Sequence, residues 1–535
     1  MHQTSTTLKL RPLKRGSACL NCRRLKIKCD AKRPSCGPCK RIPRQTQCRY
    51  SNTRCLEQEP ESVLPHLTEG LEEFPGKFSP PCTTSESCSS SCSENSLFDL
   101  ETSPLLVIQM LLQCFLIHAP QFGFFLDPER FYESAFVSPA EEVHGPSPGL
   151  LSVVCLWGVH LSQCSIPGFS EPDLLRRSRR YISIEISADG HPANILHTIQ
   201  ALVLLATYLF RNNSLREAEL HANSAATLVV ACGLHKLRSA RESCAGNTTL
   251  LDDAPPRDAI EEGERIRGFW AVAFLQTGLG IAFESHRGCY VLESPSVDID
   301  TPWPLEIVDY EEGLLPPDYL GQGTVRHLIM DDRFPASPIC MLQAKASVLF
   351  HHVSRVPAFG NNDWGSSGMT TSSTWLAMRI SQFWESLPPL HVFGAETDRP
   401  AARALALAHA FTAAATITLH RRANASENSA TAVAAARLIL ESLQAGDSSD
   451  THPVWGGLFA LACNVLLGRV RALRAFREAL AAELGLGTLV STPTAEEEEI
   501  VADLRNGFAT MAVYAGESEV IGHRLKLLLE QYGTI

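Results

Sequence analysis

Six cysteines lie within thirty residues near the beginning of the 535-residue chain, in the sequence CLNCRRLKIKCDAKRPSCGPCKRIPRQTQC. Their spacing is C-x2-C-x6-C-x6-C-x2-C-x8-C, and the residues are Cys19, Cys22, Cys29, Cys36, Cys39 and Cys48. The stretch contains few large apolar side chains and cannot bury a hydrophobic core. Bonds made by the cysteine sulfurs must therefore supply much of the folding free energy of this stretch.

The surroundings of these cysteines favour metal ligation over disulfide bonds. The N-terminal segment MHQTSTTLKLRPLKRG lacks the apolar centre of a secretory signal, and no run of eighteen uncharged apolar residues occurs in the chain. We therefore expect a soluble, intracellular protein in a reducing compartment, where clustered cysteines bind metal more often than they form disulfides. A disulfide-bonded knot is the less favoured alternative.

The number of cysteines indicates the kind of metal centre. One tetrahedral zinc ion takes four thiolates, so two ions need eight ligand positions while the stretch offers six sulfurs. Two of the sulfurs must then bridge the ions. The near repeat of C-x2-C-x6-C predicts two similar halves, each a short helical turn followed by an extended return, with Pro34 turning the chain between them.

Charge is divided unevenly along the chain. Residues 1–50 contain 14 basic residues and one acidic residue, a net charge of +13, whereas the remainder carries 33 basic and 57 acidic residues, a net charge of −24. The N-terminal segment therefore suits a polyanion, and the rest of the chain would repel one. Basic side chains also lie between the second and third cysteines, on the helix that the first C-x2-C would begin: Arg23, Arg24, Lys26 and Lys28. Such a helix can enter the DNA major groove, where lysine reaches guanine N7 and O6.

This stretch resembles the DNA-binding domain of the fungal binuclear zinc-cluster transcription factors. Both C-x2-C pairs, the basic run between them and the KRP sequence before the fourth cysteine match that family. The resemblance implies that the first and fourth cysteines bridge. One zinc ion would take Cys19, Cys22, Cys29 and Cys36, and the other would take Cys19, Cys36, Cys39 and Cys48.

The resemblance also implies a DNA-reading residue and a target. The family's base-reading lysine, three positions before the third cysteine, corresponds to Lys26, and the usual target is a CGG triplet. Leu25 departs from the family pattern, in which Arg or Lys often occupies that place, so one backbone or base contact would be absent here. A zinc module that binds protein or RNA, and a metal store or redox sensor, are less favoured alternatives. Metal spacing alone does not dictate the partner, but a store or sensor has no use for the charge of +13.

Residues 51–100 are predicted to form a disordered linker. Acidic residues and proline dominate the first part, CLEQEPESVLPHLTEGLEEF, and serine dominates PPCTTSESCSSSCSENS. The leucines of this segment keep no heptad, and Pro60 and Pro65 would break a helix, so the sequence does not predict the coiled-coil dimer that many relatives carry. A homodimer is left as an open alternative. The linker is either an acidic activation segment or a solvated tether.

From Leu105 onward the pattern predicts an all-α region, and no alternating run is long enough for a substantial sheet. Residues 196–210 carry apolar side chains at helical spacing until the sequence NNS interrupts them. A second helix should follow from Leu215 and end at Gly233 in a left-handed cap, giving an antiparallel pair. Residues 264–283 predict a third helix that buries Phe269, Trp270, Phe274 and Leu275. Alanine-rich helices are expected after residue 400, with close packing as the reason for the alanines.

One further helix is predicted in STPTAEEEEIVADL, where Thr492 or Thr494 would be the cap and Pro493 would lie in the first turn. The glutamates that follow would be favoured by the helix dipole, and recruitment of a partner is the alternative. Residues 105–400 resemble the middle homology region of the same fungal family, in the segments FFLDPERF, LVLLATYLFRNNSLREAELHANSAATLVVACGLHK, ERIRGFWAVAFLQTGLGIAF and SVDIDTPWP. The resemblance implies an all-helical regulatory domain used for inhibition, effector response or dimer contact.

These observations predict four parts: a zinc-cluster domain with a basic arm at 1–50, the linker at 51–100, a helical regulatory domain at 101–400, and a helical region packed on it at 401–535. The predicted function is that of a nuclear, sequence-specific DNA-binding transcription factor that regulates RNA polymerase II genes. Double-stranded DNA and transcription coregulators are the expected partners, two zinc ions the cofactor, and no membrane partner is expected. His221 and His235 lack metal-ligand spacing and no catalytic motif occurs, so an enzyme is the least favoured alternative.

Overall fold

The computed structural model divides the chain into two compact units, residues 1–95 and residues 96–535. In the first unit the structure describes Cys29 and Cys36. In the second it describes residues 105–136, 145–162, 166, 169–187, 192–240, 255–283, 290–293, 299–331, 334, 337–356, 367–390, 399–422, 430–442, 451–484 and 492–534.

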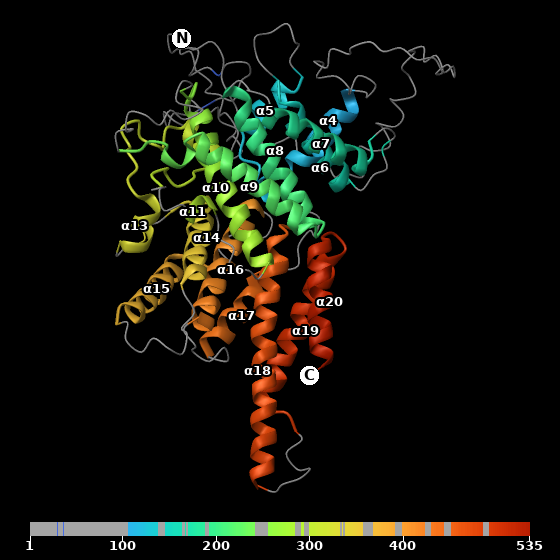
Figure 1. Ribbon diagram of the computed structural model, residues 1–535, viewed down its shortest axis with the longest axis vertical. Helices are drawn as coiled ribbons and strands as arrows, with labels where there is room; N and C mark the ends of the chain where they lie inside the picture. The colour runs from blue at the N-terminus through green and yellow to red at the C-terminus, as the bar shows by residue number, and fades with distance from the viewer. Residues whose placement is uncertain are drawn as a thin grey trace, which may run out of the picture. The chain divides into compact units, whose positions relative to one another are not determined.

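Within those ranges the second unit is built from helices and turns (Figure 1). The elements up to residue 293 are α4 (Leu105–Leu116), η2 (Ala119–Phe122), α5 (Pro128–Ser134), α6 (Pro148–Ser162), α7 (Glu171–Ser187), α8 (Pro192–Arg211), α9 (Leu215–Ala231), η3 (Leu234–Lys236), α10 (Ala259–Ala282) and α11 (Tyr290–Glu293). From residue 307 onward they are α12 (Ile307–Glu311), α13 (Thr324–Met330), α14 (Ile339–Arg355), α15 (Ser367–Ser386), α16 (Arg399–Arg422), α17 (Ala430–Ser442), α18 (Val454–Leu484), α19 (Ala495–Ala515) and α20 (Glu519–Gly533). The described residues contain isolated bridges but no named strand, which confirms the all-α prediction.

The predicted helix pair is α8 and α9. The helix α8 ends at Arg211, where the sequence NNS interrupts the apolar pattern, and Asn213 adopts a left-handed φ of 54° in the turn. Because only three residues join the helices, they pack as antiparallel neighbours. Gly233 follows α9 with a φ of 71°, the left-handed conformation that glycine adopts without a steric penalty. The predicted cap is therefore confirmed.

The helix α10 lies at the centre of the unit, in contact with α8, α9, α12, α14 and α18. Phe269, Trp270 and Leu275 are buried as predicted, whereas Phe274 is only partly buried. The buried side chains form one hydrophobic cluster that extends from Val107 to Leu528. The regions before and after residue 400 therefore share a core.

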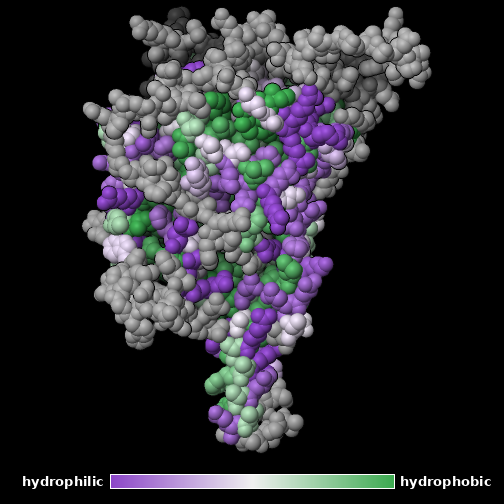
Figure 2. All heavy atoms as spheres, viewed as in Figure 1, coloured by the Kyte–Doolittle hydropathy of each residue, from purple (hydrophilic) through white to green (hydrophobic). Residues whose placement is uncertain are grey.

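The C-terminal helices pack around α18, which contacts α10, α16, α17, α19 and α20 (Figure 1). Among the described residues, α16 and α18 are long and apolar enough to span a membrane, but 72% and 61% of their most apolar windows are buried in the protein. Core packing therefore accounts for their hydropathy. The C-terminal end of α18 projects beyond its neighbours, and Phe476 is 69% exposed there. Figure 2 shows hydrophobic and hydrophilic residues interleaved along this end.

The start of α19 corrects one detail of the sequence prediction. Thr494 is the N-cap, and its hydroxyl accepts a hydrogen bond of 3.2 Å from the backbone amide of Glu497. Pro493 therefore precedes the cap and does not lie in the first turn. Proline fits there because its restricted φ suits the extended approach of the chain to the cap.

Candidate functional site

The predicted zinc cluster is described at two of its six cysteines. Cys29 is 5% exposed and Cys36 is fully buried. The other four predicted ligands lie outside the described residues, as do the predicted DNA-contact residues Arg23, Arg24, Lys26 and Lys28. Two buried thiols in a stretch with four more cysteines and a single acidic residue form a soft, sulfur-rich donor set. That chemistry fits zinc.

The described part of the helical unit offers no comparable metal centre. Among those residues, no group of three or more His, Cys, Asp or Glu side chains could hold a metal ion. Burial raises the pKa of the Cys155, Cys232 and Cys463 thiols to about 12, so these thiols stay protonated and inert. His221 lies 3.7 Å from the Glu217 carboxylate one helical turn away, and His235 is buried.

A buried polar network joins α6, α8 and the segment before α18. The Arg211 side chain is fully buried, and its Nε donates a hydrogen bond of 3.2 Å to His160 Nε2. One terminal nitrogen donates to the Thr451 carbonyl at 2.8 Å, and the guanidinium lies over the Phe122 ring at 5.7 Å. Burial lowers the pKa of Arg211 to about 10, so the group remains a cation at neutral pH.

The same network continues to α7. The Glu171 carboxylate accepts a hydrogen bond of 2.6 Å from the Tyr208 hydroxyl and lies 3.2 Å from His160 Nδ1. The hydrogen bond from His160 lowers the pKa of Glu171 and outweighs the effect of burial. The Trp157 ring packs edge-on against both His160 and Tyr208. These contacts satisfy the buried polar groups and support a structural role.

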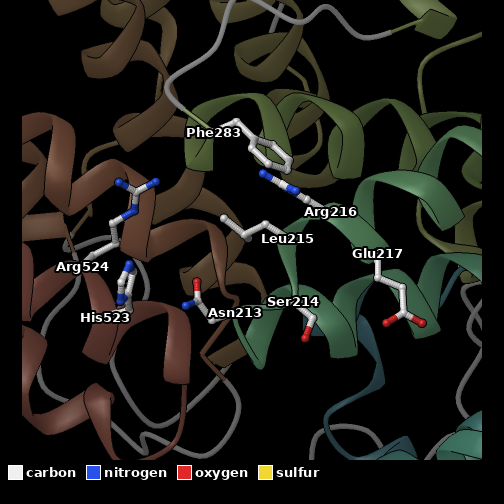
Figure 3. Close-up of a pocket in the computed structure, with 8 residues that line it drawn as sticks. All are labelled: Asn213, Ser214, Leu215, Arg216, Glu217, Phe283, His523 and Arg524. Atoms are coloured by element: carbon white, nitrogen blue, oxygen red, sulfur yellow. The ribbon is translucent and has the colours of Figure 1, made fainter.

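A surface cleft of about 530 Å³ lies at the N-terminal end of α9 (Figure 3). Its lining residues are Asn213, Ser214, Leu215, Arg216, Glu217, Phe283, His523 and Arg524. Figure 3 shows Arg216 beside the Phe283 ring, while the Glu217 carboxylate points away, and Glu217 pairs with Arg179 at 2.6 Å. None of the lining residues is buried, and Arg216 and His523 are exposed. The cleft is therefore open to solvent.

A smaller, partly open cavity of about 130 Å³ lies beside α10. It is lined by Pro120, Gln121, Gly123, Phe124, Phe125, Arg267, Trp270, Ala271, Phe274, Pro304, Cys340, Gln343, Ala344 and His452. The residues come from five places in the chain: η2 with the turn after it, α10, the segment before α12, α14 and the segment before α18. No sequence motif predicts this cavity, because the segments that line it are separated along the chain.

Two family models match the chain. The model described as Fungal Zn(2)-Cys(6) binuclear cluster domain matches residues 17–58. The model described as Fungal specific transcription factor domain matches residues 110–275. The first match includes all six predicted ligand cysteines, and the second includes α8, α9 and most of α10. No curated protein and no solved structure gives a significant match.

The two matches confirm the resemblance to the fungal zinc-cluster transcription factors. The chain carries a zinc-binding, DNA-binding domain ahead of a helical domain, the arrangement of a fungal transcription factor. Domains of the first family bind two zinc ions and DNA, often as dimers, and both families are transcription factor domains rather than enzymes. Residues 276–400 of the expected middle homology region lie outside the second match.

Proposed function

We propose that this protein is a nuclear regulator of RNA polymerase II genes that reads CGG-type triplets in duplex DNA. The observation that carries the proposal is the coincidence of six cysteines and a net charge of +13 within residues 1–50. Thiolates would hold two zinc ions and thereby fix a small scaffold, while the surrounding cations would neutralise phosphates. The rest of the chain carries a net charge of −24 and would repel DNA. We therefore assign DNA binding to the N-terminal end.

In this proposal the six cysteines hold two zinc ions, with Cys19 and Cys36 as the bridging ligands. The zinc ions supply structural cross-links and no chemistry on a substrate. Lys26 contacts guanine in the major groove, and Arg23, Arg24 and Lys28 contact the backbone or neighbouring bases. The buried state of Cys29 and Cys36 supports ligand roles for these two residues.

The proposed domain organisation assigns residues 1–50 to DNA binding, 51–100 to a linker, and 101–400 together with 401–535 to regulation. The shared hydrophobic cluster supports treating the last two as one regulatory unit, since it runs from Val107 to Leu528. The proposed partners are duplex DNA and transcription coregulators. A homodimer would place two cluster domains on paired half-sites, so half-site number reports the oligomeric state.

In vitro selection of random duplex DNA by the full-length protein tests the proposal. Enrichment of CGG-containing sites is the expected result, and a fixed spacing between two triplets would indicate a dimer. Duplex RNA of the selected sequence serves as the competitor, because a zinc module for RNA would bind it equally well. Absence of any enriched DNA sequence, or equal competition by the RNA, would refute DNA reading. A fluorescent fusion of the full chain reports nuclear accumulation separately.

A further inference from the structure

The partly open cavity beside α10 has preformed aromatic walls. Phe124, Phe125, Trp270 and His452 are buried, so packing holds them in place. The Trp270 ring stacks on Trp303 with 4.3 Å between ring centroids. The indole Nε1 of Trp270 also donates a hydrogen bond of 2.6 Å to the Pro302 carbonyl, which fixes the ring orientation. A ligand entering the cavity would therefore meet a rigid apolar surface, the usual wall of a small-molecule site.

The cavity lining carries one fixed charge, the guanidinium of Arg267. No lining residue is acidic. Burial lowers the pKa of His452 to about 3, and the ring nitrogen Nδ1 accepts a hydrogen bond from the Val454 amide, so this imidazole is neutral. Burial also raises the pKa of the Cys340 thiol, which donates to the Pro304 carbonyl at 3.3 Å and stays protonated. The lining residues therefore carry a net positive charge, while the Glu306 carboxylate lies close enough to Cys340 to raise the pKa of that thiol further.

Arg267 makes no hydrogen bond and no ion pair within the part of the chain that the structure describes. The cation is partly buried, and Phe125 and Trp270 line the same cavity. Arg238, which is also partly buried, does pair with an acid: its Nε lies 2.5 Å from the Glu262 carboxylate. Within the described residues the donors of this guanidinium stay available, and an incoming carboxylate would complete two parallel N–H···O bonds with it.

The cavity volume limits the size of the ligand. A space of about 130 Å³ is close to the roughly 150 Å³ of an apolar cavity that admits benzene. The amides of Gln121 and Gln343 line the same space and add donors and acceptors. We propose that this cavity binds a monocyclic aromatic carboxylate, with its carboxylate on Arg267 and its ring against Trp270 and Phe125.

The surface cleft of Figure 3 is the competing place for an organic anion. It is larger and includes Arg216, but its lining residues are all at least partly exposed to solvent. Water therefore screens the attraction that its cations exert. The cavity beside α10 combines buried aromatic rings with a cation that makes no hydrogen bond within the described residues, and it is the better match for an anionic aromatic molecule. An effect of the ligand on transcription would rest on the proposed function. Binding of the ligand to the cavity does not rest on it.

Titration of the purified full-length protein with benzoate and with phenylacetate tests the proposal. Calorimetry measures affinity, and intrinsic tryptophan fluorescence, to which Trp270 contributes as one of seven tryptophans, gives a second signal of binding. Saturable binding of at least one of these acids is expected, with benzyl alcohol binding at least about tenfold more weakly because it lacks the charge that pairs with Arg267. Saturation by neither acid, or equal affinity for benzyl alcohol, would overturn the assignment.

Two variants locate the site. Arg267→Gln should lower the affinity for the acid by about tenfold or more. The variant should keep the fold, because the arginine makes no hydrogen bond or ion pair with the residues that the structure describes. Ala344→Leu should abolish binding by filling the cavity. The matched control is Arg216→Gln in the surface cleft, which should bind like the wild type. Wild-type affinity in Arg267→Gln, or a loss confined to Arg216→Gln, would contradict the proposal. DNA affinity is measured on the same samples. Failure of the acids to bind while DNA binding is intact would count against the ligand site alone, and loss of DNA binding would count against the proposed function.

Discussion

The guanidinium of Arg211 donates a hydrogen bond of 2.8 Å to the backbone carbonyl of Thr451, 240 residues further along the chain. Arg211 lies at the end of α8, inside the matched region of residues 110–275, and Thr451 lies outside it. The hydroxyl of Ser518 also lies 3.4 Å from the Arg211 carbonyl. The matched region therefore depends on the C-terminal helices to satisfy its buried groups, so a chain cut at residue 275 would leave this cation without its carbonyl partner.

Substitution of Arg211 by Met is expected to destabilise the helical unit by about 3 kcal/mol. The change removes the buried donor and leaves the acceptors at His160 and Thr451 unsatisfied. Chemical denaturation of the full chain, followed by far-UV circular dichroism, measures the loss. Arg216→Gln is the control, because this exposed arginine in the next helix should change stability by no more than about 0.5 kcal/mol. Equal midpoints for the two variants would contradict the structural role of Arg211.

The helices were predictable from sequence because their signals are local. The end of α8 follows from the turn residues NNS, and the end of α9 follows from Gly233, since each signal lies within a few residues of the boundary. The position of Pro493 was predicted wrongly because two threonines compete for the cap, and the hydrogen bond from Glu497 decides in favour of Thr494.

Contacts between distant segments were not predictable in this way. The glutamates of α19 predict a helix start, but they do not reveal that Glu497 is buried between Arg474 and Arg477 of α18. The cavity beside α10 and the partner of Arg211 depend likewise on tertiary packing. The zinc cluster is the opposite case, because its spacing alone indicates the chemistry. Of its predicted ligands, Cys29 and Cys36 are the ones that the structure describes.

Gly158 to Ala is expected to destabilise the protein by about 1 to 3 kcal/mol. A Cβ at Gly158 would lie 2.5 Å from the backbone carbonyl oxygen of Leu111, so the contact between α4 and α6 would have to open. Gly516 to Ala is the matched control, because nothing lies within 4 Å of its Cβ position and its φ is −67°. That control should be neutral or stabilising by about 0.5 kcal/mol. If the two variants unfold at the same temperature, the close packing of α4 on α6 is refuted.

The buried Glu264 predicts a pH dependence of stability. Burial raises its pKa from the ordinary 4.5 to about 7. The Asp127 and Glu261 charges act in the same direction, and Arg130 and a 2.8 Å hydrogen bond from the Asp127 amide oppose them. The folded state therefore holds a proton that the unfolded state releases above pH 4.5. The stability contributed by this carboxyl is fully present below that pH and is lost as the pH rises through about 7.

Glu264→Gln should remove this dependence, because the amide keeps an acceptor for the Asp127 amide but does not ionise. The variant is expected to gain about 1 to 3 kcal/mol over the wild type near pH 8, and little near pH 4.5. Denaturation across that pH range measures the difference. Glu129→Gln, at an exposed position of α5, is the control and should give a difference that does not vary with pH. A pH-independent difference for Glu264→Gln would argue against the raised pKa.

Removal of zinc should abolish DNA binding and leave the helical unit folded. The predicted ligands are confined to residues 19–48, and the described residues contain no other group suited to a metal. The full chain would be treated with a chelator, then assayed for metal content, DNA affinity and far-UV circular dichroism. We expect two zinc ions per chain before treatment, loss of specific binding with the metal, and recovery when zinc is restored. Unchanged DNA affinity in metal-free protein, or collapse of the helical signal, would contradict this division of roles.

Lys26 and Arg24 should differ in what they contribute to DNA binding. Lys26→Ala is expected to cost about 1 to 3 kcal/mol on a CGG site and to relax base preference, because the lysine is assigned to guanine. Arg24→Ala should weaken binding to all sequences alike and lower the salt slope by about 1, because this arginine is assigned to phosphate. Affinities of the full chain for a CGG site and a scrambled site, measured over a range of salt concentrations, separate the two effects. If Lys26→Ala lowers both affinities equally, the lysine contacts the backbone and another residue reads the triplet.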